Sequence, residues 1–146
     1  IGDMREFNIL DHTADIMVEG IGETLEEAFE AIALALISVM VDIRIVKSKY
    51  RLSGEVRTEN GNFEDLLIDF LNKLIFIKDA KKFIFSDVRV SIKKERGNLV
   101  AEFELEGDYY TSSEYEFSVD VKGASYSAAK VERVGDRYIC RCVVDV

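Results

Sequence analysis

The sequence contains no proline among its 146 residues, and no stretch rich in serine and glycine interrupts it. Linkers between domains are commonly built from these residues, so the chain offers no candidate domain boundary. Its length is also close to the commonest size of one domain. We therefore expect a single domain over residues 1–146.

Long apolar runs are missing as well. The longest, residues 31–41, is interrupted by Ser38 and is shorter than the roughly 18 apolar residues that a membrane helix needs. No basic segment followed by an apolar stretch opens the chain, although that is the pattern of a secretory signal. These absences predict a cytoplasmic protein with no membrane partner.

Cysteine is scarce, since only Cys140 and Cys142 are present, two positions apart in a strand-like run. Side chains two apart on one strand face diverge from good disulfide geometry. We expect both to be reduced thiols, which agrees with a cytoplasmic location. Together with the single histidine they supply too few ligands for a zinc site.

Positive charge is in deficit. The chain has 19 Lys and Arg residues against 28 Asp and Glu, so its net charge is −9, and its isoelectric point is about 4.7. Tight nucleic-acid binding draws much of its affinity from basic side chains, so we expect no such direct binding here. A cation or a basic protein surface suits this chain better. The acidic runs 23–30 and 102–108 are expected to be solvated faces, with a docking surface for a basic partner as the alternative.

Two segments carry the signature of helices. Thr24 and Glu27 form a capping box at the start of a helix over residues 25–40. The second half of this helix is apolar on nearly all sides, which predicts that it packs on two sides and forms the centre of the core. Asn62 is expected to cap a second helix over residues 63–77.

The rest of the chain is dominated by patterns of period two. Turn residues at 96–98 and at Gly135 predict hairpin connections, and no glycine-rich phosphate loop follows any expected strand. The resulting class is α+β, with two helices packed on a largely antiparallel or mixed β-sheet. Strands are expected at residues 5–10, 16–21, 43–45, 50–58, 88–92, 99–105, 115–121 and 138–144.

The polar segment 11–15 is the first candidate for chemistry. His12 is the only histidine, so nucleophilic catalysis would have to use it, with Asp11 or Asp15 as orienting group, but no nucleophile is evident. Polar side chains of short loops commonly bond to the backbone and hold a turn, which is the alternative for His12 and Thr13. The segment lacks the oxygen-rich alternation of an EF-hand, so further cation ligands must come from distant parts of the chain.

The last two residues are the second candidate. Asp145 and Val146 place a side-chain carboxylate next to the terminal carboxylate, and both are hard anionic oxygen ligands. The alternative is a frayed terminus. Fraying is the commoner outcome for final residues, so spacing alone favours it.

Several blocks of sequence resemble one known family. DHTADI at residues 11–16, followed by TLEEAFE at residues 24–30, is similar to the opening of the archease family. EDLL at residues 64–67 resembles the family's second helix, and VKGASY at residues 121–126 with the final two residues resembles its closing strands. The likeness spans nearly the whole chain and implies a single archease-like domain.

The resemblance implies a non-catalytic protein that activates the RtcB-type RNA ligase of tRNA splicing. Members of the family promote guanylylation of the ligase and its multiple turnover, and they carry a divalent cation, typically calcium. By position, the implied cation ligands are Asp15, Asp145 and the terminal carboxylate of Val146. Hard oxygen ligands of this kind suit calcium or magnesium. His12 and Thr13 are then expected to shape the loop.

The chain departs from the family pattern at one block. Where the family often has Lys-Ala-x-Thr-Tyr-His, residues 122–127 are KGASYS. Ser125 therefore stands in place of the threonine and Ser127 in place of the histidine. The second histidine of the family pattern is therefore absent from this chain.

Two other functions are alternatives. One is a general chaperone or specificity modulator of tRNA-modifying methyltransferases, a role also suggested for archease-like proteins. The other is a metal-dependent hydrolase that uses Asp11, His12 and Asp15. Such an enzyme needs an open coordination position and a substrate pocket, and the sequence shows no sign of a pocket.

Overall fold

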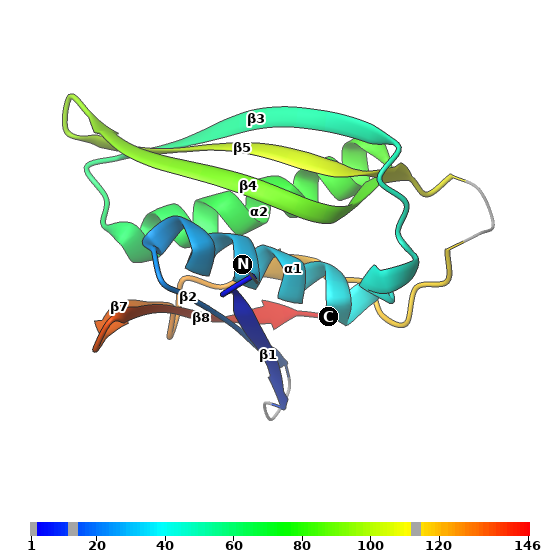
Figure 1. Ribbon diagram of the computed structural model, residues 1–146, viewed down its shortest axis with the longest axis horizontal. Coiled ribbons are helices and arrows are strands. Elements are labelled where there is room, and N and C mark those ends of the chain that lie inside the picture. Colours follow the sequence, from blue (N-terminus) through cyan, green and yellow to red (C-terminus); the bar gives the residue numbers. More distant parts are fainter. Residues whose placement is uncertain (1–2, 12–14, 112–114) are drawn as a thin grey trace.

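The computed structural model describes residues 3–11, 15–111 and 115–146. Over these residues the chain forms two α-helices, one short 3-10 helix and eight strands. Figure 1 shows three layers, with a three-stranded sheet at the top, the two helices in the middle and a five-stranded sheet below. All strand pairs in these ranges are antiparallel, so the predicted α+β class is confirmed.

The five-stranded sheet is built from both ends of the chain. β1 (Glu6–Asp11) and β2 (Ile16–Gly22) form a hairpin, and β2 pairs on its other side with β8 (Arg137–Asp145). The far edge of β8 pairs with two short strands, β6 (Gly123–Ala124) and β7 (Lys130–Val134). The second strand of the chain and the last one are thus direct neighbours.

The helix α1 (Leu25–Met40) begins at the predicted capping box. The N–H of Glu27 donates to Thr24 Oγ1 at 3.1 Å, and the N–H of Thr24 donates to the Glu27 carboxylate at 3.3 Å. The helix packs against β2 on one side and against β4 (Phe83–Glu95) on the other, so most of its residues are buried. The prediction of a central helix packed on two sides is confirmed.

The helix α2 (Phe63–Lys81) is capped by Asn62 as predicted, but it continues one turn beyond its expected end. The expected end lay before Lys78, whose charge interrupts the apolar stripe. In the structure Lys78 is buried, its ammonium group contacts Asp120, and it lies 2.9 Å from the Asp79 carboxylate. These partners compensate the buried charge, so the helix can continue through this position.

The three-stranded sheet has the order β3-β5-β4, in which β3 (Tyr50–Glu59) and β4 flank β5 (Asn98–Tyr109). β4 and β5 form the predicted hairpin, and its turn places Arg96 and Gly97 at φ 53° and 83°. Glycine adopts this left-handed conformation at little cost, which suits it to the tight connection.

Two differences from the predicted strands arise from local backbone bonds. Residues 43–45 form a turn of 3-10 helix, η1 (Ile43–Ile45), because Asp42 accepts a hydrogen bond from the N–H of Arg44 at 3.0 Å. β7 is not among the predicted strands, and it pairs with β8 through the predicted turn at Gly135.

The strand predicted over residues 115–121 is wrong. The hydroxyl of Tyr115 donates to the buried Asp108 carboxylate at 2.7 Å, and the N–H of Ser118 donates to the Met40 carbonyl at 2.8 Å. These contacts attach the segment to β5 and to the end of α1. Tyr115 and Val121 are buried in the core, Val119 is exposed, and the backbone of residues 115–121 joins no strand ladder.

Most acidic side chains of the runs 23–30 and 102–108 are exposed or half-buried, as solvated faces require, while the apolar side chains between them face the core. Glu30 and Asp108 are exceptions, because both are buried. Glu30 accepts a hydrogen bond from the N–H of Val90 at 2.9 Å, and burial raises the pKa of its carboxyl. The prediction of a solvated face is therefore wrong at these two positions.

Cys140 and Cys142 are free thiols, as predicted. They pair with Gly20 and Val18 of β2, and both cysteine side chains are buried in the core. Among the described residues, no helix combines the length and the apolar character needed to cross a membrane.

Candidate cation-binding site

The ends of β2 and β8 bring two predicted ligands together. The antiparallel ladder pairs Ile16 with Val144. Asp15 immediately precedes Ile16 and Asp145 immediately follows Val144, so the two aspartates lie at the same end of neighbouring strands. Opposed positions of an antiparallel pair carry their side chains on the same face, close enough to interact.

An open cavity of about 320 Å³ lies at this end of the sheet. β8 runs through the middle of the cavity wall, because β2 pairs with one edge of β8 and β6 pairs with the other edge. The residues that line the cavity are Asp15, which directly precedes β2, Val143 and Asp145, from β8, and Ser125, Ser127 and Ala128, from the turn after β6.

The polar side chains of this cavity offer only oxygen ligands, namely two carboxylates and two hydroxyls. Calcium and magnesium bind such oxygens, and two neighbouring negative charges favour a cation between them. Within the described ranges, no three His, Cys, Asp or Glu side chains gather at one point. A calcium ion would therefore need oxygens beyond the side chains of Asp15 and Asp145, from hydroxyls, backbone or water. The residues present fit a hard divalent cation of this kind.

The chain is held in the sheet up to Asp145. The N–H of Lys122 donates to the Asp145 carbonyl at 2.8 Å, and Gly123 pairs with Asp145 in the ladder. Fraying is therefore wrong as a description of Asp145. Val146 follows outside β8, with 42% of its surface exposed, and it is not among the residues that line the cavity. Its role as a ligand stays a prediction.

The serine turn is a part of the site that the sequence did not indicate as ligand-bearing. The N–H of Ser127 donates to Ser125 Oγ at 3.2 Å, and Ala128 adopts a left-handed conformation with φ 63°. The only available signal was the departure from the family pattern at residues 122–127. It marked these hydroxyls as unusual but did not place them beside the aspartates.

The other loop candidates are not brought to the cavity. His12 and Thr13 lie outside the described residues. Asp11 ends β1, where it pairs with Ile16, and it does not line the cavity. Of the three residues in the hydrolase hypothesis, the described part of the chain thus places only Asp15 there.

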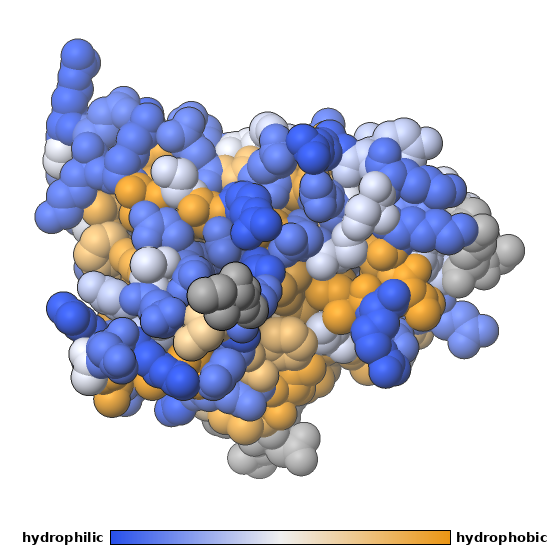
Figure 2. Space-filling model, in the orientation of Figure 1, coloured by the Kyte–Doolittle hydropathy of each residue, from blue (hydrophilic) through white to orange (hydrophobic). Residues whose placement is uncertain are grey.

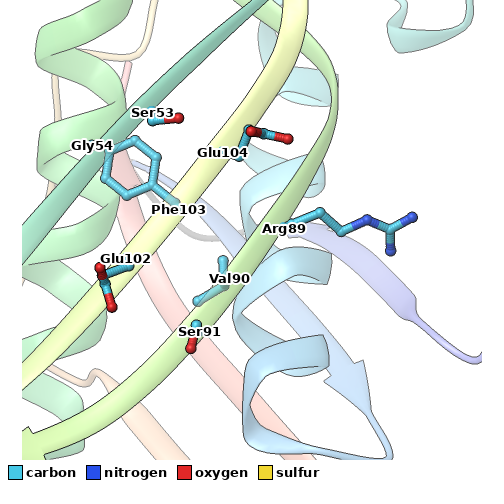
Figure 3. A pocket seen from close by; sticks show the side chains of 8 residues that line it. All are labelled: Ser53, Gly54, Arg89, Val90, Ser91, Glu102, Phe103 and Glu104. Carbon is cyan, nitrogen blue, oxygen red and sulfur yellow. The ribbon is translucent and has the colours of Figure 1, made fainter.

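A second cavity, of about 350 Å³, lies on the face of the three-stranded sheet that points away from the helices (Figure 3). Its acidic side chains already have cationic neighbours. Glu102 lies 3.2 Å from the Lys93 ammonium group, and Glu104 lies 3.9 Å from the Arg51 guanidinium. Figure 3 shows Arg89 extending away from the cavity. These pairs describe a surface charge ladder rather than a ligand site.

Apolar side chains are exposed along β1, the edge strand of the five-stranded sheet. Phe7, Ile9 and Leu10 are 37%, 44% and 39% exposed, and Met4 just before the strand is 48% exposed. Figure 2 shows apolar surface in the region of this hairpin, below a largely polar face. Exposed apolar groups beside a free strand edge are typical of surfaces that bind proteins.

The fold and the cavity define a three-layer α+β protein whose oxygen-lined site lies where its second and last strands meet. The family model described as Archease protein family (MTH1598/TM1083) matches residues 7–146. The chain belongs to the archease family.

Individual relatives agree with this assignment. Protein archease of Pyrococcus furiosus is 36% identical over 144 residues, which are 98% of this chain and 100% of the relative. Protein archease of Thermococcus gammatolerans is 38% identical over the same shares. The solution structure of Methanobacterium thermoautotrophicum protein 1598 has a TM-score of 0.83 at 28% identity and covers 99% of this chain and 100% of its own.

A more distant structure shares the fold. The crystal structure of a Thermotoga maritima protein, described as an archease and possible chaperone, has a TM-score of 0.56 at 24% identity, with 94% of both chains covered.

Proposed function

We propose that this protein is a non-catalytic activator of an RtcB-type RNA ligase in tRNA splicing. It promotes guanylylation of the ligase and its multiple turnover, and it holds a divalent cation, calcium, through Asp15, Asp145 and the terminal carboxylate of Val146. The observation that carries the proposal is the register of β2 and β8, which brings Asp15 beside Asp145 in a chain of the archease family.

The residues around the cavity suggest how the protein works. Asp15 and Asp145 concentrate negative charge on neighbouring strands, and the backbone bond from Lys122 fixes the residue that precedes the terminal carboxylate. When bound, the cation would supply positive charge that offsets this repulsion. It would also offer a coordination position for an oxygen atom of a partner protein. The exposed apolar edge of β1 and the net charge of −9 favour a protein partner over RNA.

The test uses Asp15→Asn, which removes one charge with little change of shape. Calcium affinity, measured by calorimetry, is expected to fall at least 10-fold, the scale typical of even indirect changes at metal sites. Transfer of labelled guanylate to a purified ligase should lose its stimulation in parallel. Asp136→Asn is the matched control, because Asp136 is exposed in the turn before β8, at the opposite end of that strand, and both readouts should be unchanged.

A pair of extended proteins tests Val146 separately. Residues added after Val146 convert the terminal carboxylate into a neutral amide and crowd the cavity, so calcium affinity and ligase stimulation should both fall. The same residues added before Ile1 should change neither. Equal calcium affinities of the two extended proteins would show that Val146 is not a ligand. Stimulation of a tRNA methyltransferase and not of the ligase would contradict the proposed partner.

A further inference from the structure

A side chain of α2 holds the short strand that precedes the serine turn. β6 has only two residues, and it pairs with β8 along one edge. The N–H of Ala124 donates to Asn72 Oδ1 at 2.9 Å, and Asn72 Nδ2 donates to the Ala124 carbonyl at 3.2 Å. One amide group thus satisfies both backbone groups that a further strand would otherwise pair.

The segment held in this way contributes to both sides of the cavity. The N–H of Lys122 donates to the Asp145 carbonyl at 2.8 Å, and the N–H of Ser125 donates to the Val143 carbonyl at 3.0 Å. Ser125 directly follows Ala124, so a displacement of Ala124 moves the serine wall. The same displacement loosens the bond that fixes Asp145. A two-residue strand has few ladder bonds of its own, so the two bonds from α2 are a large part of what holds it.

The neighbouring turn of α2 carries a second contact to the same segment. Asp69, three residues before Asn72, accepts a hydrogen bond from the hydroxyl of Tyr126. Asparagine is a poor residue for a helix interior, since its amide competes for backbone bonds. In this protein the Asn72 amide forms its hydrogen bonds with the backbone of β6 and not with the backbone of its own helix.

We propose that Asn72 is a positioning residue for the cation site. By fixing Ala124 it sets the serine turn and the end of β8 at the separation at which their oxygens surround one ion. Asn72 does not itself line the cavity, so its effect is indirect. The inference rests on the proposed cation site.

The experiment compares Asn72→Ala with the unaltered protein by calorimetric titration with calcium. Calcium affinity is expected to fall about 10-fold, as is usual for groups that orient metal ligands. Backbone amide exchange at residues 123–125 should become faster at the same time. Tyr110→Phe is the control, because it removes another hydrogen bond onto α2, from the Tyr110 hydroxyl to the Lys78 carbonyl at 2.8 Å. It should lower stability without changing calcium affinity.

The outcomes separate this role from the proposed function. If the unaltered protein binds calcium and Asn72→Ala binds it equally well, the positioning role is overturned and the cation site stands. An equal loss of affinity in Tyr110→Phe also overturns the role, since general destabilisation would then explain it. No calcium binding by the unaltered protein overturns the cation site and this role with it. Should Asn72→Ala not fold, Asn72→Asp keeps an acceptor for the Ala124 N–H but has no donor for the Ala124 carbonyl, so calcium affinity is expected to fall, by less than in Asn72→Ala; unchanged affinity would overturn the role.

Discussion

Gly20→Ala is expected to lower the free energy of unfolding by about 3 kcal/mol, because α1 crosses β2 with backbone against backbone at this position. A Cβ on residue 20 would lie 2.3 Å from the backbone nitrogen of Ile32 and 2.5 Å from the carbonyl oxygen of Ala28. Ordinary contact begins at 3.4 Å, so the helix or the strand must move by about 1 Å. β4 packs on the other side of α1, so the helix has no free space into which it can retreat.

The magnitude follows from the kind of atoms involved. Overpacking of a well-packed core usually costs 1–3 kcal/mol, and backbone atoms cannot rotate away as a side chain can, so the upper end of that range applies. For a chain of this length, about 3 kcal/mol corresponds to a fall in Tm of roughly 6–12 °C.

Urea unfolding and thermal melts measure the effect, and Gly123→Ala is the control. A Cβ on residue 123 would meet its nearest atom, Asn72 Oδ1, at 3.7 Å, which is ordinary contact. Both changes replace glycine by alanine, so they restrict the unfolded chain alike. Equal stability of the two variants would refute the argument from close packing of α1 on β2.

Two further predictions concern buried titratable groups. Burial raises the pKa of both cysteine thiols, that of Cys142 to about 12, so a thiol-reactive dye at pH 8 should label Cys140 and Cys142 only after unfolding, and rapid labelling of the folded protein would contradict their burial. Burial also raises the pKa of Glu30 above 4.5, so the folded state binds more protons than the unfolded one, and the stability of the unaltered protein should rise relative to Glu30→Gln as the pH falls from 7 through that pKa. A difference in unfolding free energy that is constant over this range would contradict the assignment.

The elements best predicted from the sequence are those whose signals close within a few residues. Thr24 and Glu27 bond to each other's backbone within one turn, and Asn62 caps α2 in the same way, so both helix starts follow from local chemistry. The β4–β5 hairpin is fixed by its turn, since Gly97 supplies the positive φ at the tip. Local patterns failed where a partner lies far away in the sequence, as with Lys78, whose buried ammonium group contacts Asp120 from outside the helix as well as its neighbour Asp79.

The sequence by itself determined the starts of both helices, the β4–β5 hairpin and the presence of carboxylates at Asp15 and Asp145. The tertiary structure alone decided that these two carboxylates meet, that residues 115–121 stay outside any sheet, and that Asn72 completes the edge of β6. A strand forms only where another backbone is available to pair with it, and an alternating pattern cannot say which one that is. Neighbours in space such as Asp15 and Asp145 are set by the register between the second strand and the last, which depends on the whole core that brings those strands together.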